Sequence, residues 1–362
     1  MAPDIITIDG SMGEGGGQIF RTALAYAAVT RRPVKIFNIR AKRSNPGLRP
    51  QHLSALRALA KITKAEVRGD YVGSMEVMFK PRKIEGGEIT IDPGTAGSIS
   101  LIIQAVLPTL LYAERKSIVT IKGGTDVPWS PPIDAIRYVL IPALRNIGVN
   151  AQLEVIRRGH YPRGGGIVRL VVEPITEPLK PIILKEQGKI LRIKGISHCV
   201  RLPKHVAERQ VKSAEQILRN AGITDTIDIS LEWYPPEKDP HLGPGSGIVL
   251  WAETTTNALL EYDSLGARGK RAEKVGEEAA NGLVEQIRRG GAVDVHHTDQ
   301  LILFMALAKG NSEIYSSEIS LHTLTAIEVA KMIIGANFNV QGAKGEPGFI
   351  SAQGIGLSPE TI

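Results

Sequence analysis

The sequence predicts an α/β fold of the α+β type: a large domain of three repeated α/β units around a pseudo-threefold axis, plus a small inserted α/β domain. Three observations lead to this prediction. Strand-like and helix-like apolar patterns alternate along the chain. The 38 glycines and 22 prolines cluster between those patterns, as turn residues do. The order strand, Gly-rich turn, helix, strand, loop, helix, hairpin recurs with a step of ~80–90 residues.

The first unit opens the chain. Alternating apolar residues predict a strand at 5–9, and the Gly-rich segment 10–17 predicts a turn after it. An Ala-rich run predicts a helix at 18–30. The other elements predicted for this unit are a strand at 34–39, a loop at 40–50, a helix at 51–62, and strands at 65–68 and 75–79.

The second unit repeats this order. It begins with a predicted strand at 88–91, a turn at 92–97 and an apolar helix at 98–113. A hairpin closes it, with three consecutive glycines at 164–166 in its turn. The remaining predicted elements are a strand at 117–122, a loop at 123–131, a helix at 132–147 and a strand at 167–172.

The third unit is interrupted by the inserted domain. The predicted boundaries are 1–185 and 291–362 for the large domain, and 186–290 for the insert. The insert contains predicted strands at 190–196, 227–231 and 248–254, and helices at 206–220 and 271–289. The third unit is expected to comprise a strand at 182–184, a turn at 296–300, a helix at 301–308, a strand at 312–315, a loop at 316–321, a helix at 322–334, and a hairpin of 338–341 with 349–352.

The composition limits the class of protein. With 43% apolar and 22% charged residues, the chain has the balance of a globular protein and not of a disordered one. The single cysteine, Cys199, excludes a disulfide framework and a cysteine-based zinc site. The longest apolar run, 101–113, is too short to cross a bilayer, and no secretory leader is recognisable. We therefore expect a cytoplasmic protein without a membrane partner, whose oligomeric state the sequence leaves open.

The net charge of +7 favours a polyanionic partner, and two basic or Gly-rich loops are candidates for binding it. The loop 10–17 lacks the Lys-Ser/Thr pair of a Walker A motif, so it is either a tight strand–helix turn or a phosphate site. Glu14 within it favours the second interpretation, because a carboxylate beside phosphates requires a bridging cation. The loop 40–52 carries four cations and is either a solvated loop or a phosphate clamp built from arginine forks.

If three like units surround an axis, the N-termini of their helices converge, and their free N–H groups attract phosphate. Together with Arg21, Arg40 and Arg43, these helix starts predict an anion pocket. His322 begins one such helix, where the helix dipole favours the neutral imidazole that a nucleophile needs. For the adjacent pair His296-His297 we favour nucleotide contact over metal ligation. The other histidines that we weighed are expected to be structural: His160, His198, His205 and His241.

These motifs resemble, in order along the whole chain, the RNA 3′-terminal phosphate cyclases. The matching segments are 13–18, 40–52, 123–126 with 130–132, 160–166, 204–209, 299–301 and 322–325. The resemblance implies a family fold of three repeats with an insert, and an enzyme that uses ATP to convert an RNA 3′-phosphate to a 2′,3′-cyclic phosphate. It also implies that His322 is the nucleophile, forming a histidine–AMP intermediate, with pyrophosphate and AMP as products.

Site roles follow from this resemblance and from the predicted pocket. The nucleotide-binding set is Gln104, Pro131, His296, His297, Thr298, Asp299 and Gln300. The set for the RNA phosphate is Arg21, Arg40, Arg43, Gln51 and His52. Glu14 is predicted to place a divalent ion, Mg²⁺ or Mn²⁺.

Two departures from the family pattern are present. His296 and His297 replace less basic residues, and Ala326 follows Thr325 where an asparagine is expected. Two other functions stay open at this point. One is a non-catalytic, cyclase-like RNA-binding assembly factor, and the other is a transferase for small phosphorylated metabolites similar to the enolpyruvyl transferases. The presence of His322 disfavours the first, and the basic loop disfavours the second.

Overall fold

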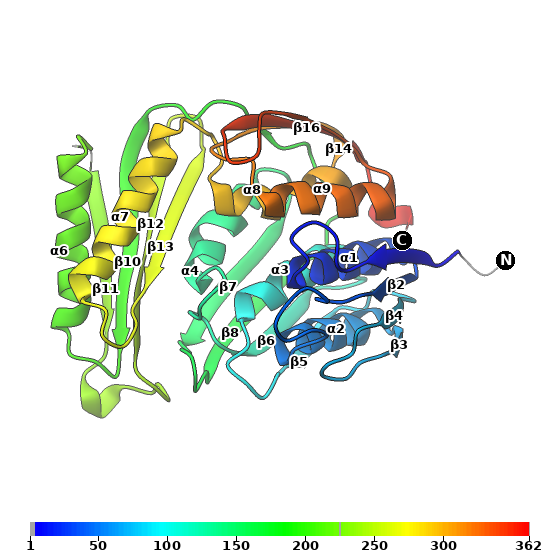
Figure 1. The fold of residues 1–362 in the computed structure, drawn as a ribbon, viewed down its shortest axis with the longest axis horizontal. Helices are drawn as coiled ribbons and strands as arrows, with labels where there is room; N and C mark the ends of the chain where they lie inside the picture. Colours follow the sequence, from blue (N-terminus) through cyan, green and yellow to red (C-terminus); the bar gives the residue numbers. More distant parts are fainter. Residues whose placement is uncertain (1–3, 224–225, 362) are drawn as a thin grey trace.

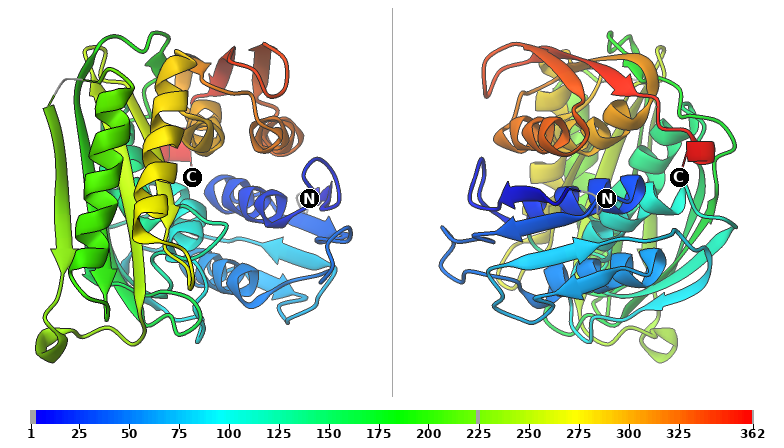
Figure 2. Two further views of the ribbon diagram at one scale, coloured as in Figure 1. Left: turned by 60° about the vertical axis from the view of Figure 1, so that its left-hand side comes forward. Right: turned by 90° about the vertical axis from the view of Figure 1, so that its right-hand side faces the viewer.

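The structure, a computed structural model, describes residues 4–223 and 226–361. Four sheets of four strands are arranged in two lobes, with the sheet of the inserted segment and its two helices forming the left-hand lobe in Figure 1. The other three sheets lie on the outside of the larger lobe, and their helices lie between them (Figure 2). Within the described residues, no helix is both long and apolar enough to cross a membrane.

The sheets of the three repeated units share one topology. In each sheet, the first two strands along the chain are neighbours and run parallel. The fourth strand lies on the other side of the second, and the third strand lies beside the fourth; both of these pairings are antiparallel. The predicted threefold repeat of strand order is therefore confirmed. Even the two-residue strand β9 (Ile183–Leu184) takes its place as the first strand of the third unit, 125 residues before β14 (Lys309–Ser316) resumes it.

The elements of the three units are as follows. The first unit comprises β1 (Ile6–Asp9), α1 (Gly17–Thr30), β2 (Val34–Phe37), α2 (Pro50–Thr63), β3 (Glu66–Arg68) and β4 (Val77–Lys80). The second comprises β5 (Gly87–Ile91), α3 (Ile99–Leu110), β6 (Ser117–Gly123), α4 (Ile133–Ala135), α5 (Ile141–Arg145), β7 (Asn150–Arg157) and β8 (Gly166–Glu173). The third comprises β9, α8 (Val295–Leu307), β14, α9 (Leu321–Ile334), β15 (Asn337–Gln341) and β16 (Gly348–Ile355).

The inserted segment forms a sheet in the order β11-β10-β12-β13, covered by two helices. Its elements are β10 (Ile190–Val200), α6 (His205–Asn220), β11 (Thr226–Trp233), β12 (Gly245–Thr254), β13 (Leu259–Leu265) and α7 (Ala272–Arg288). It has a hydrophobic cluster of its own, whereas one continuous core joins the three repeated units. The domain boundaries themselves stay a prediction.

A few element predictions were wrong. The segment 296–300 is not a turn but the start of α8, because Asp294 caps the helix by accepting hydrogen bonds from the backbone N–H groups of His296 and His297. The helix predicted at 132–147 is divided by a π-helical segment, Ile136–Leu140. Strand β13 was missed because Glu261 occupies a buried position in it and breaks the expected alternation of polar and apolar residues.

Candidate active site

The helices of all three repeated units contribute to one cavity. Its wall includes Gln18 and Arg21 of α1, Gln104 of α3, five residues of α8 and His322 of α9. The loop after β6 adds Pro131 and Trp129. Of the predicted nucleotide-binding residues, those that line this cavity with His322 are Gln104, Pro131, His296, Asp299 and Gln300. Their contact with a nucleotide stays a prediction.

His297 and Thr298 are the exceptions, because neither of them lines this cavity. Both are buried away from the cavity. The hydroxyl of Thr298 donates to the carbonyl of Asp294 at 2.8 Å and contacts the Ser316 hydroxyl at 2.7 Å. The reason is helical periodicity, since positions 296, 299, 300 and 303 share the face of α8 that lines the cavity and 297 and 298 do not.

His297 has a structural role. Its Nδ1 lies 2.9 Å from Oδ2 of Asp294, the residue that caps α8. Burial opposes a charge on this imidazole, but the Asp294 carboxylate outweighs burial and raises the pKa of His297 above its usual value. The side chain therefore serves the start of α8 and not the cavity.

Gln18 fixes the ring of His322. The Gln18 amide nitrogen donates to Oδ2 of Asp299 at 2.9 Å and to the backbone carbonyl of His322 at 3.2 Å. Because both partners are acceptors, they determine which end of the amide is nitrogen. Its oxygen then accepts from Nδ1 of His322 at 2.8 Å. Nδ1 must therefore carry the hydrogen, which leaves the lone pair on Nε2.

His322 lies at the start of α9 and faces the cavity. Ser320 caps α9 through a hydrogen bond from the N–H of Thr323, so His322 lies in the first turn of the helix. The side chain is exposed and lines the cavity. Asp299, which holds Gln18, is shielded enough that burial raises its pKa to about 7, although His297 and Arg21 oppose this rise. The site can therefore present Nε2 of His322 to an electrophile.

The Gly-rich loop is shaped by close approach of the Glu14 and His52 side chains. The N–H of Gly16 donates to Oε1 of Glu14 at 2.9 Å. A Cβ atom at Gly16 would lie 2.4 Å from Oε2 of Glu14, and one at Gly17 would lie 2.2 Å from Nε2 of His52. At Gly17 a side chain would collide with the buried His52 ring, whereas at Gly16 it would meet the ends of the flexible Glu14 and Arg43 side chains, which can move.

A substitution tests this requirement. We expect Gly17→Ala to lower the free energy of unfolding by about 1–3 kcal/mol, the usual cost of overpacking. Denaturant unfolding of the full chain measures the change. Gly97→Ala is the matched control, because a Cβ atom there would make only ordinary contacts of 3.4–3.6 Å. Equal stability of the two variants would contradict the steric explanation.

Glu14 does not form a ready metal site. Its Oε2 is paired with Arg43 at 2.6 Å, and its Oε1 accepts from Gly16. Mg²⁺ prefers six oxygen ligands, and here a single carboxylate is already neutralised by a guanidinium. The arrangement present therefore does not fit a bound divalent ion, and the predicted role of Glu14 as a metal ligand would require Arg43 to move.

Cations surround His52 beside this loop. Nδ1 of His52 accepts from the N–H of Arg49 at 3.1 Å. Burial and the nearby charges of Arg21, Arg40 and Arg49 lower the pKa of His52 to about 3, so the imidazole is neutral. Burial also lowers the pKa of Arg21, to about 10, which leaves it charged at neutral pH. The predicted anion pocket is thus brought together, with Arg49 as an added cation.

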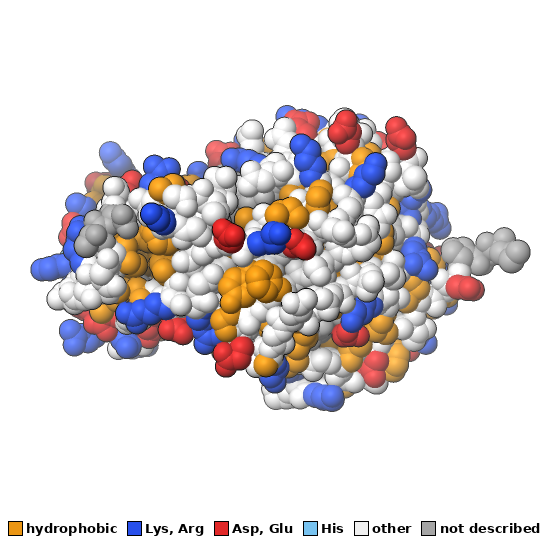
Figure 3. Space-filling view, turned by 90° about the horizontal axis from the view of Figure 1, so that it is seen from above, with side chains coloured by type: hydrophobic (Ala, Val, Ile, Leu, Met, Phe, Trp, Pro, Cys, Tyr) orange, Lys and Arg blue, Asp and Glu red, His pale blue; other side chains and the backbone are white. Residues whose placement is uncertain are grey.

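Two members of the predicted phosphate set have partial roles in the scaffold. The Arg40 guanidinium donates to the carbonyls of Asn45 at 2.6 Å and Gly47 at 3.0 Å, so it holds the basic loop in shape. Gln51 lies at the start of α2 next to Gly97, the turn before α3. On the face seen in Figure 3, acidic and basic side chains are interspersed.

Sequence reasoning missed three positions that the structure places at the cavity or at the start of α8. Gln18 falls within the Gly-rich motif, but nothing local indicates that it contacts a histidine 304 residues away. Asp294 could have been found as a helix N-cap three residues before His297. Trp129, whose side chain is 99% exposed at the cavity with a φ of 60°, gave no signal beyond its place in a Pro-rich loop.

The three repeated α/β units thus place an arginine, Arg21, and a histidine, His322, in the wall of one cavity. The family model for RNA 3′-terminal phosphate cyclase matches residues 12–340. The chain belongs to that family.

Named relatives agree with this assignment. An RNA 3′-terminal phosphate cyclase of Staphylothermus marinus is 56% identical, covering 98% of this chain and all of that protein. The protein of the same name from Desulfurococcus amylolyticus is 54% identical, covering 98% of this chain and 99% of that protein. Among solved structures, the enolpyruvyl transferase NikO from Streptomyces tendae aligns over 97% of this chain and 82% of its own, with 9% identity and a TM-score of 0.20, too low to support an argument.

Proposed function

We propose that the chain converts the 3′-terminal phosphate of RNA to a 2′,3′-cyclic phosphate with ATP, through a covalent histidine–AMP intermediate and an RNA-adenylate. The supporting observation is the Gln18–His322 hydrogen bond, which leaves the Nε2 lone pair of His322 free at the cavity. The names of the full-length relatives support the overall reaction. A non-catalytic assembly factor would have no use for a histidine held in this tautomer.

In the first step, Nε2 of His322 forms a bond to the α-phosphorus of ATP. The bond from that phosphorus to the bridging oxygen breaks, and pyrophosphate leaves with the electron pair. The ring gains positive charge as the bond forms. Gln18 stabilises that charge, because its oxygen accepts the hydrogen on Nδ1.

In the second step, an oxygen of the RNA 3′-phosphate bonds to the same phosphorus, and the P–N bond breaks to restore His322. Arg21, Arg43 and the neutral His52 are the groups proposed to hold that phosphate. In the third step, the vicinal 2′-hydroxyl attacks the terminal phosphorus, loses its proton to solvent, and displaces AMP. Ring closure needs little assistance because the hydroxyl is already adjacent to its target.

The experiment is a cyclisation assay with a synthetic RNA that ends in a 3′-phosphate. We expect a phosphatase-resistant end, with one AMP and one pyrophosphate formed for each RNA. The matched substrate lacks the terminal 2′-hydroxyl and should stop at the RNA-adenylate. An RNA that binds without any turnover of ATP would favour the assembly factor and overturn the proposal.

Gln18 acts as a positioning residue in this mechanism. We expect Gln18→Ala to lower the rate of adenylation by about 10–100-fold, the range for groups that orient a ligand or catalytic ring. Gln18→Glu places a carboxylate against Nδ1 and favours the imidazolium, so the acidic limb of the pH–rate profile should move to higher pH. Single-turnover adenylation at a series of pH values measures both effects, with the exposed Gln152→Ala on β7 as control. An unshifted profile in Gln18→Glu would contradict the assigned contact.

A further inference from the structure

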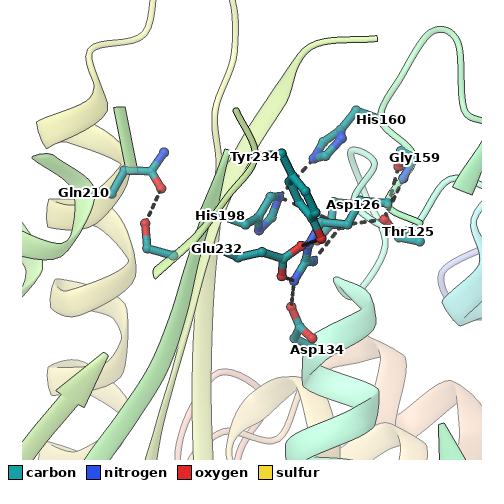
Figure 4. Close-up of polar contacts among 11 residues, drawn as sticks. Thr125, Asp126, Asp134, Gly159, His160, His198, Gln210, Glu232 and Tyr234 are labelled. Atoms are coloured by element: carbon teal, nitrogen blue, oxygen red, sulfur yellow. Dashed lines mark hydrogen bonds and ion pairs between the residues drawn. The ribbon is translucent and has the colours of Figure 1, made fainter. Parts of the chain in front are cut away.

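A second cluster of chemically active side chains lies at the contact between the inserted sheet and the second repeated unit (Figure 4). Asp126 follows β6, His160 lies between β7 and β8, and His198 lies within β10. All three are buried, and one ligand atom from each lies within 4.8 Å of the others. The proposed cyclase mechanism uses none of them.

The two imidazoles face each other through their Nε2 atoms, which are 3.0 Å apart. As a hydrogen-bonded pair they must share one hydrogen, because only one of the two nitrogens can donate. A metal ion could take the place of the shared hydrogen, because the Nε2 lone pairs of both rings would then be free to face it, and imidazole is a usual ligand of Zn²⁺.

Asp126 completes a ligand set. Its Oδ2 lies 4.0 Å from Nε2 of His198 and accepts from the Thr125 hydroxyl at 2.6 Å. Its Oδ1 is buried without a hydrogen-bond partner among the described residues. Such an oxygen is costly to bury unless a donor or a cation meets it. The carboxylate therefore has one oxygen, Oδ2, near the histidine pair and a second, Oδ1, without a partner.

The charge around the cluster also accommodates a cation. The Arg158 guanidinium, with 1% of its side chain exposed, contacts the carboxylates of Asp126 at 3.2 Å, Asp134 at 2.6 Å and Glu232 at 2.7 Å. Burial raises the pKa of Asp134, so this carboxyl holds a proton more readily than usual. Even with Asp134 neutral, the carboxylates of Asp126 and Glu232 face the single guanidinium of Arg158, so these side chains together keep an excess of negative charge.

A comparable cluster nearby lacks these properties. Glu261, Asp294 and His297 also lie close enough to share an ion. There, however, Nδ1 of His297 is already paired with Asp294 at 2.9 Å, and Asp294 also accepts from backbone N–H groups of α8 and of Glu261. Asp294 is thus engaged at the start of α8, although Oε1 of Glu261 and Nε2 of His297 have no hydrogen-bond partner among the described residues. This cluster offers one imidazole where the first offers two, and that difference favours the first cluster for a transition-metal ion.

We propose that Asp126, His160 and His198 bind a divalent transition-metal ion, with Zn²⁺ as the preferred ion, and that this ion ties the inserted sheet to the second repeated unit. Three protein ligands of nitrogen and oxygen type leave a fourth position, as zinc sites allow. Two ligands come from the repeated unit and the third comes from β10 of the insert. The ion therefore cross-links two lobes that also meet through the Arg158–Glu232 ion pair and through an apolar contact of Tyr138 with Trp251.

The test uses the full-length chain, stripped with a chelator and titrated with Zn²⁺ in competition with a chromophoric chelator, without ATP. We expect the wild type to bind one equivalent of Zn²⁺. Loss of a residue that only supports a metal ligand lowers metal affinity by about 10–100-fold, so loss of the ligand itself in His198→Ala should lower the Zn²⁺ affinity by at least that much. His205→Ala is the matched control, since His205 is an exposed histidine of the same inserted segment. Zn²⁺ should raise the melting temperature of the wild type and of His205→Ala, and leave that of His198→Ala unchanged.

Other outcomes decide against the site. If the wild type and His198→Ala bind Zn²⁺ with equal affinity, the proposal is overturned. It is also overturned if His322→Ala loses Zn²⁺ binding while His198→Ala keeps it, because the ion would then lie in the cavity. If His198→Ala does not fold, the visible spectrum of the Co²⁺-loaded wild type tests the proposal. A four-coordinate, tetrahedral site of nitrogen and oxygen ligands gives intense d–d bands. Weak bands like those of aqueous Co²⁺ would overturn the proposal.

Discussion

Replacing His322 with alanine should abolish the covalent labelling of the protein by ATP that carries a label on its α-phosphate. The wild type is expected to retain label through denaturation and alkali and to release it in acid, as a phosphorus–nitrogen bond does. Removal of a nucleophile costs on the order of 10⁴-fold or more in rate, because the remaining groups bind substrate without forming the intermediate. Electrophoresis of the denatured protein followed by autoradiography measures this result.

The structure also predicts which nitrogen of His322 carries the label. Because Gln18 accepts the hydrogen on Nδ1 at 2.8 Å, the adenylyl group should be attached to Nε2. Mass spectrometry of the labelled peptide, with ³¹P NMR against the two isomeric phosphoramidates, distinguishes the nitrogens. His205→Ala should be labelled like the wild type. Label in His322→Ala would show that another histidine is the nucleophile, and attachment at Nδ1 would show that the Gln18 contact is broken before reaction.

The second large effect is expected on stability, at Arg158. This guanidinium is buried between three carboxylates, with Glu232 contributed by the inserted sheet and the other two by the second unit. Arg158→Met keeps much of the volume but leaves buried carboxylates without a counter-charge. Breaking a buried ion pair in this way costs about 3–5 kcal/mol. We expect a loss of that size in urea unfolding at neutral pH, whereas Arg169→Met, at an exposed pair with Glu154, should change stability by less than about 0.5 kcal/mol.

The pH dependence separates charge from packing. Burial alone would raise the pKa of Glu232, but the Arg158 contact outweighs burial and lowers it to about 2, below the unfolded value of 4.5. In the wild type this contribution to stability is present above about pH 4.5 and is lost as the pH falls toward 2. In Arg158→Met the buried carboxylates take up protons readily and lose their penalty in acid. The stability gap between the two proteins should therefore narrow on acidification, and a constant gap would indicate lost packing instead.

Much of the architecture was predictable because its signals are local. Alternating apolar residues and Gly-rich turns identified the three repeats, and even β9 was placed before the insertion that separates it from β14. The exceptions have physical causes. Strand β13 was not predicted because the buried Glu261 breaks its alternation of polar and apolar residues. The segment 296–300, expected to be a turn, is helical because Asp294 caps the start of α8. That helix start is also why His297 and Thr298 face the interior and not the cavity.

The sequence by itself determined the repeat, the Gly-rich and basic loops, and the position of His322 at the beginning of a helix, because periodicity and capping depend on residues a few positions apart. Only the tertiary structure decided which side chains meet. Gln18 reaches Asp299 and His322 across 281 and 304 residues, and His160 reaches His198 across the boundary of the insert. Such contacts depend on how separate units pack, which no local pattern encodes. The tautomer of His322 and the buried cluster around Arg158 therefore became visible only when the helices and sheets were placed together.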